Sequence, residues 1–61
     1  MSKPIRYYFW VEMGKEKEWN QLGCCHGYHT SFECKKDNNF MIDFSEKNGN
    51  RWTILEAKPM V

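Results

Sequence analysis

Three cysteines and two histidines crowd one short stretch of this sequence: Cys24-Cys25-His26, then His29, then Cys34. Thiolate sulfur and imidazole nitrogen are the ligands that zinc prefers in tetrahedral protein sites. The spacing is poor for a single ion, because adjacent residues of an extended chain point to opposite sides. The sequence therefore predicts no bound metal and no cofactor. A zinc-stabilised small domain built on these five residues is the alternative.

Cys25 and His26 also have the residue types of a nucleophile and its base. A reactive thiol needs an imidazolium or a helix N-terminus held against it, and adjacency in sequence does not provide that contact. The sequence shows no third catalytic residue in a recognisable order. A chain of 61 residues leaves little room for a substrate pocket of roughly 300 Å³ or more. The prediction is that the protein is not an enzyme.

Aromatic residues form the second grouping that could bind something. They make up 16% of the sequence, and the run Tyr7-Tyr8-Phe9-Trp10 is unbroken. Side chains alternate between the two faces of a strand, so this run would place rings on both faces. Near the other end of the chain, Trp52 and Ile54 would place large apolar side chains on the face of their strand that is opposite the predicted core face. Either a closed, tightly curled sheet buries both faces, or one aromatic face is exposed and binds a partner.

The strongest local signal of secondary structure in the sequence is the dipeptide Asn48-Gly49. This dipeptide lies between two runs rich in strand formers, residues 40–44 and 51–55. Asn-Gly favours the two-residue turn of a β-hairpin, because both turn positions need a positive φ. Such a turn pairs Ile42 with Leu55. The predicted core face of this hairpin comprises Phe40, Ile42, Phe44, Thr53, Leu55 and Ala57.

The first third of the chain predicts another hairpin. Residues 5–13 are a nearly continuous run of strand formers, followed by Gly14-Lys15, which suits a two-residue turn. This turn would place Trp10 opposite Trp19, a favourable cross-strand pair. A three-residue loop would shift the register and pair Val11 with Trp19 instead.

The segment between the hairpins, residues 23–39, is ambiguous. Thr30-x-x-Glu33 has the form of a capping box, which predicts a short helix through about Asp37. The same residues alternate as a strand would. We expect the helix, and hence one α+β, β-rich domain over residues 1–61: a four-stranded antiparallel sheet of two hairpins with a short helix between them. The alternative is a five-stranded small β-barrel.

Composition narrows the functional classes. Nine basic and eight acidic residues give a net charge of +1, which argues against a strongly basic nucleic-acid binder. No apolar run approaches the roughly 18 residues of a membrane span, and the start of the chain does not resemble a secretory signal. Three cysteines do not close into a disulfide framework, so we expect free thiols in a reducing cytoplasm.

These observations favour a small intracellular adaptor or inhibitor, of the kind that phages often encode, acting through an exposed aromatic sheet face. The expected partner is another protein or a second copy, and a homodimer is the simplest case. The expected binding residues are Tyr8, Trp10, Trp19, Arg51, Trp52 and Ile54. The alternative is a single-stranded nucleic-acid binder that stacks bases on Tyr8, Trp10 and Trp52, which the near-zero net charge disfavours.

Overall fold

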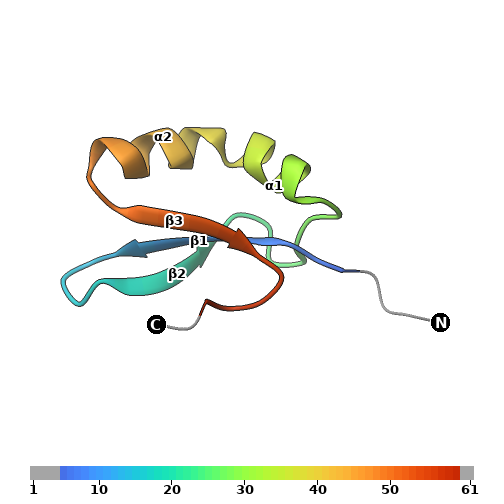
Figure 1. Cartoon of the computed structure of the whole chain (residues 1–61), viewed down its shortest axis with the longest axis horizontal. Coiled ribbons are helices and arrows are strands. Elements are labelled where there is room, and N and C mark those ends of the chain that lie inside the picture. Colours follow the sequence, from blue (N-terminus) through green and yellow to red (C-terminus); the bar gives the residue numbers. More distant parts are fainter. Residues whose placement is uncertain (1–4, 60–61) are drawn as a thin grey trace.

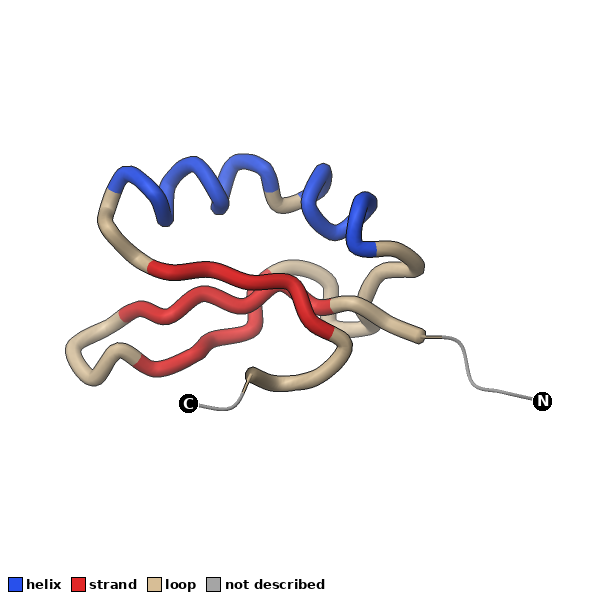
Figure 2. The backbone as a smooth tube through the Cα atoms, in the orientation of Figure 1, coloured by secondary structure: helices blue, strands red, loops and turns tan. Residues whose placement is uncertain are grey.

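The computed structural model describes residues 5–59 and arranges them in two layers, one sheet and one pair of helices (Figure 1). In chain order the elements are β1 (Tyr8–Met13), β2 (Glu18–Leu22), α1 (Ser31–Asp37), α2 (Asn39–Lys47) and β3 (Arg51–Leu55). The strands are ordered β2-β1-β3, and both pairings are antiparallel, so β1 is the central strand. The helices follow one another across one face of the sheet, and the opposite face carries no helix (Figure 2).

The predicted four-stranded sheet of two hairpins is wrong, and so is the barrel alternative. The described residues contain one open sheet of three strands, with β2 and β3 at its edges. Residues 40–44, expected as a strand, lie within α2. Consequently Ile42 does not pair with Leu55: Ile42 is buried on α2, whereas Leu55 lies opposite Tyr8 and is exposed.

Asn48-Gly49 ends a helix rather than turning a hairpin. Gly49 has a φ of +70°, but Asn48 has a φ of −97°, so only one of the two residues is in the left-handed region. The Gly49 N–H donates to the Glu46 carbonyl, and the Asn50 N–H donates to the Ser45 carbonyl. This pair of bonds is the Schellman motif, which satisfies the last carbonyls of a helix. The chain then reverses and enters β3.

The first hairpin forms as predicted, but with a different register. Its loop has four residues, from Gly14 to Lys17, and the Lys17 N–H donates to the Gly14 carbonyl at 3.2 Å. Trp19 therefore lies opposite Glu12, and neither predicted partner, Trp10 nor Val11, faces it directly. Because the register differs from the predicted one by two residues, Trp10 and Trp19 stay on the same face of the sheet, in diagonal positions.

The capping box correctly predicted α1. Thr30 has extended backbone angles, and its hydroxyl accepts a hydrogen bond from the Glu33 N–H at 3.1 Å. A helical run then extends to Asp37, as expected. Asn38 joins α1 to α2, and its buried side chain donates to the Cys34 carbonyl at 2.8 Å. This bond satisfies the Asn38 amide where the chain passes from one helix to the next.

The core lies between the helices and the sheet. Phe9 and Val11 of β1 are fully buried against Cys34 of α1 and Ile42 of α2. Half-buried residues close the sides of this core: Tyr7, Met13, Leu22, Tyr28, Met41, Trp52 and Ile54. Because side chains alternate along a strand, Phe9 and Val11 point toward the helices, and the even-numbered residues of β1 point away.

Candidate functional site: two outward aromatic surfaces

Four of the six predicted binding residues lie on the sheet face that has no helix. Tyr8 and Trp10 belong to β1, and the registers place Trp19 of β2 and Arg51 of β3 on the same side. We call this group, Tyr8, Trp10, Trp19 and Arg51, the sheet face. Its aromatic rings are less accessible than predicted, because Tyr8 and Trp19 are half-buried and Trp10 is only 8% exposed.

Trp10 is the most enclosed member of the sheet face. Its indole N–H has no hydrogen-bond partner among the described residues. Residues 56–59 turn back along this side of the sheet (Figure 1), where Pro59 is buried. Lys58 and Trp19 line the same hollow. The end of the described chain thus lies on the sheet face.

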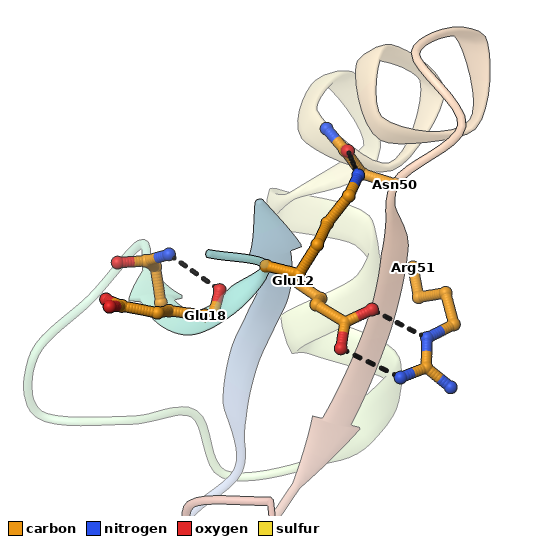
Figure 3. Close-up of polar contacts among 6 residues, drawn as sticks. Glu12, Glu18, Asn50 and Arg51 are labelled. Carbon is orange, nitrogen blue, oxygen red and sulfur yellow. Dashed lines mark hydrogen bonds and ion pairs between the residues drawn. The ribbon is translucent and has the colours of Figure 1, made fainter. Parts of the chain in front are cut away.

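An ion pair holds Arg51 in place at the edge of the sheet face. Its guanidinium donates two hydrogen bonds of 2.8 Å to the two carboxylate oxygens of Glu12 (Figure 3). The same guanidinium lies 5.6 Å from the centre of the Trp19 ring, within cation–π range. The hydrogen bonds from Arg51 lower the pKa of Glu12. Arg51 is therefore already occupied by a carboxylate and a ring.

The remaining two predicted residues, Trp52 and Ile54, lie on the opposite side of the sheet. Trp52 is opposite Val11, and Ile54 is opposite Phe9, so both side chains face the helices. The Trp52 ring packs 5.9 Å from the Phe9 ring, and its indole N–H donates to Glu46 of α2 at 3.2 Å. The expectation that Trp52 and Ile54 share a surface with Tyr8 and Trp10 is therefore wrong. That expectation assumed that residues 40–44 form a strand paired with residues 51–55, so that Leu55 faces the core and Trp52 and Ile54 face away from it.

The most exposed aromatic rings of the described chain lie on the helices. Phe32 of α1 is 73% exposed, Phe40 of α2 is 80% exposed and Phe44 of α2 is 47% exposed. These residues are spaced by multiples of four, and Lys36 occupies the intervening position. Residues four apart share one side of a helix, and the buried residues Cys34, Asn38 and Ile42 recur every four positions across the junction of α1 and α2. The exposed sides of the two helices are therefore aligned, and we call Phe32, Lys36, Phe40 and Phe44 the helix stripe.

The helix stripe points away from the sheet because the opposite side of each helix is buried. Cys34 and Ile42 face the core, and residues two positions away on a helix turn by about 200°. Phe32, Phe40 and Phe44 each stand two residues from one of these buried positions. At the α1 end of the helix stripe is an open hollow of about 340 Å³ lined by Phe32, Lys35, Lys36 and Asn39.

The cysteines and histidines do not form one site. Cys24 and Cys25 are exposed in a turn, whereas Cys34 is fully buried in the core. His29 lies beside Arg6, with nitrogen–nitrogen distances of 3.4 and 3.5 Å. Within residues 5–59, no three His, Cys, Asp or Glu side chains are grouped so that they could hold a metal ion. Burial raises the pKa of the Cys34 thiol, which keeps it in the neutral form.

Tyr28 connects the turn that carries Cys24 and Cys25, which we call the cysteine turn, to α1. The sequence did not indicate this role. Its hydroxyl donates to Asp37 at 2.8 Å and accepts from the Cys24 N–H at 3.2 Å. Its backbone exchanges two hydrogen bonds of 2.9 Å with Tyr7. Burial and the Asp37 carboxylate together raise the pKa of Tyr28. These contacts make Tyr28 a structural residue between the turn and α1.

The helix stripe was missed because its residues fit two patterns. Phe40, Ile42 and Phe44 alternate as a strand would, and Phe40 and Phe44 also have the i, i+4 spacing of a helix face. The residues that distinguish a helix from a strand here precede Phe40 in the sequence. Phe32 and Lys36 extend the four-residue spacing beyond the length of one strand, into the segment that the Thr30 capping box had already marked as helical.

Comparisons with protein-family models, with curated proteins and with solved structures found no match to this chain. The geometry itself defines the class: a two-layer α+β protein with a three-stranded antiparallel sheet and two consecutive helices on one face. Neither helix in residues 5–59 has the length and apolar character required to cross a bilayer.

Proposed function

We propose that this protein is a small, non-catalytic, protein-binding module of the cytoplasm, acting as an adaptor or inhibitor through the helix stripe. The observation that carries the proposal is the exposure of three phenylalanines on one side of two consecutive helices. Together they offer on the order of 300–500 Å² of aromatic surface, taking 150–250 Å² for a whole ring side chain. An apolar surface of that size is about as large as the largest patch on a typical monomer, and such patches are often functional.

The sheet face is less suited to this role. Burying a surface yields free energy only in proportion to the area that was exposed beforehand. Trp10, the largest residue at its centre, is already 92% covered, and Tyr8 and Trp19 are partly covered. On the helix stripe, Phe40 retains four-fifths of its accessible surface, so a partner gains more by covering it.

The arrangement of charge also disfavours nucleic acid on the sheet face. Stacked bases bring phosphates that need free cations beside the rings. Arg51 lies over Trp19, and both carboxylate oxygens of Glu12 already hold its guanidinium. Trp52, a residue of the predicted base-stacking set, lies on the other side of the sheet. A protein partner is therefore the better match.

The side chains around the helix stripe indicate the chemistry of the partner. Lys36 interrupts the phenylalanines, and exposed Glu33, Asp43 and Lys47 lie on the same two helices. A complementary partner presents apolar groups opposite the rings, an acid opposite Lys36 and a base opposite Glu33 or Asp43. Such alternating charges set the register of a complex, while the aromatic rings supply most of its affinity.

The test is affinity capture with the tagged protein as bait, comparing the wild type with a Phe40→Ser, Phe44→Ser double variant. We expect the wild type to retain a protein, its own untagged copy included, that the double variant loses. Trp19→Ala is the matched control, because it removes an aromatic ring from the sheet face and leaves the helix stripe intact. Circular dichroism confirms that all three proteins are folded. Equal retention by the wild type and the double variant would refute the proposed function.

A further inference from the structure

We propose that the partner on the helix stripe is a second copy of this chain, bound antiparallel about a two-fold axis that passes beside Phe40. The inference rests on the proposed function, and it adds the identity and the orientation of the partner. The helix stripe is well shaped for self-association. Its residues lie on the exposed side of two consecutive helices, with Phe40 80% exposed and α1 and α2 in one layer (Figure 2).

The spacing of charges along the helices selects an antiparallel register. Cys34, Asn38 and Ile42 are buried at intervals of four residues, so the exposed side continues from α1 to α2 across Asn38. In an antiparallel pair with Phe40 opposite Phe40 of the second copy, exposed residues are then opposite when their numbers sum to about 80. Glu33 then meets Lys47 of the second copy, and Lys36 meets Asp43. All four of these residues are exposed. Symmetry doubles each contact, so the dimer contains four pairs of opposite charge.

The aromatic and aliphatic groups fit the same register. Lys36 lies opposite Phe44 of the second copy as well as Asp43, so its aliphatic stem can cover the ring while its ammonium group reaches the carboxylate. The two Phe40 rings meet at the two-fold axis. The other helix-stripe residues of both chains surround this ring–ring contact. Large aromatic side chains at the centre of an interface, with charges at its rim, are typical of stable complexes.

A parallel arrangement of the same two surfaces is disfavoured. It would place each residue opposite its own copy, bringing Glu33 to Glu33, Lys36 to Lys36 and Asp43 to Asp43. Like charges held directly opposite one another repel and thereby disfavour that orientation. The charge pattern thus separates the two possible two-fold arrangements, which the phenylalanines alone do not.

The size of the surface sets the expected affinity. The exposed phenylalanines of two chains, with the stems of Lys36 and Lys47, bring the buried area to about 1,000 Å², which is below the range of stable specific interfaces and within that of weak, transient ones. Such an interface supports a dissociation constant in about the micromolar range rather than an obligate dimer. The cysteine turn and the sheet face stay outside this interface.

Sedimentation equilibrium of the purified protein, from about 1 µM to 1 mM, tests the proposal across the range in which such a small interface should form. We expect the wild type to pass from monomer to dimer and Phe40→Asp to remain monomeric. Lys36→Glu should weaken the dimer by about tenfold, since two attractive contacts become repulsive. The double variant Lys36→Glu, Asp43→Lys restores opposite charges and should recover most of the affinity.

Lys15→Glu is the matched control for Lys36→Glu, because it makes the same charge change on the exposed β1–β2 turn. It should leave the dissociation constant unchanged. A wild type that stays monomeric throughout, or a double variant no better than Lys36→Glu alone, would overturn the antiparallel dimer. Either result leaves the capture experiment to decide the proposed function independently, since a different protein can still be lost with Phe40 and Phe44.

Discussion

The helix stripe and the sheet face both carry large aromatic residues, yet they differ in what those residues already contact. On the sheet face, Trp10 is almost covered, and Arg51 is bound by Glu12 and lies over Trp19. On the helix stripe, Phe32 and Phe40 keep more than two-thirds of their surface in solvent. Aromatic residue type therefore does not identify a binding surface in this protein. The two surfaces differ in how much aromatic area is exposed, and that difference is the basis for proposing the helix stripe as the binding surface.

The largest expected effect separates a core phenylalanine from one of the helix stripe. Phe9→Ala should destabilise the fold by about 3–5 kcal/mol, because Phe9 is fully buried and its removal leaves a cavity. Phe40→Ala makes the same chemical change at an exposed position and should alter stability by less than about 0.5 kcal/mol. Urea unfolding of both variants measures the difference. Comparable losses would show that Phe40 is part of the core.

The next effect concerns the support of Tyr8 on the sheet face. Gly27 has a φ of +81°, and a Cβ there would lie 2.8 Å from the Arg6 Cβ and 3.0 Å from the Tyr8 ring. Gly27→Ala should cost about 2–4 kcal/mol, from strain and collision together. Gly14→Ala, at a φ of +92° with nothing within 4 Å, isolates the strain and should cost about 1 kcal/mol. Thermal unfolding would contradict this account if the two variants were equally stable.

Trp52 provides a third contrast. Truncating it should reduce stability if it packs under the helices, and should reduce association if it lies on an exposed binding surface. It packs on Phe9 and donates to Glu46, so Trp52→Ala should lower the free energy of unfolding by about 2 kcal/mol. Its effect on self-association should be indirect and vanish once the variant is fully folded. Chemical unfolding and sedimentation together measure both quantities. A stable Trp52→Ala variant that no longer associates would return Trp52 to the binding surface.

Thiol reactivity distinguishes the exposed cysteine turn from the core. Cys24 and Cys25 are accessible, whereas Cys34 is fully buried and burial raises its pKa, so little reactive thiolate forms. A small aromatic disulfide reagent should modify two thiols in the native protein and a third only on unfolding. The Cys34→Ala variant should show the same two native reactions. Three fast reactions in the folded wild type would place Cys34 at the surface.

The smallest expected effect is the pH dependence of the Glu12–Arg51 pair. Since Arg51 lowers the folded-state pKa of Glu12, the pair stabilises the fold above the ordinary pKa of a glutamate. That contribution is lost as the pH falls through the lowered value. Glu12→Gln should therefore flatten the acid side of the stability profile, whereas Glu16→Gln on the adjacent turn should not. Parallel acid profiles for the wild type and Glu12→Gln would show that the pair contributes nothing.

Local signals in the sequence predicted the elements that depend on local contacts. The Thr30 capping box marked the start of α1 correctly, because a cap is satisfied by a backbone N–H three residues away. The run from Ile5 to Met13 correctly indicated a strand and a following hairpin. Its register was mistaken because a four-residue loop closed by the Gly14 carbonyl replaced the two-residue turn.

The second half of the fold depended on a choice that local signals did not make. A glycine with positive φ serves both a type I′ turn and a Schellman cap, so Gly49 is consistent with a strand or a helix before it. The pattern of Phe40, Ile42 and Phe44 fits both as well. The choice depends on tertiary packing, because on α2 Ile42 is buried in one core cluster with Phe9 and Val11 of β1. The exposure of Phe40 and Phe44, and the side of the sheet on which Trp52 and Ile54 lie, depended on that choice.

One measurement tests the central claim, that the helix stripe is the surface through which this protein binds its own copy. An isotope-filtered nuclear Overhauser experiment on a mixture of labelled and unlabelled protein detects only contacts between chains. We expect signals between the Phe40 rings of the two copies and between the Lys36 stem of one copy and Phe44 of the other. Signals from Tyr8, Trp19 or Leu55 instead, or no intermolecular signal at millimolar concentration, would contradict it.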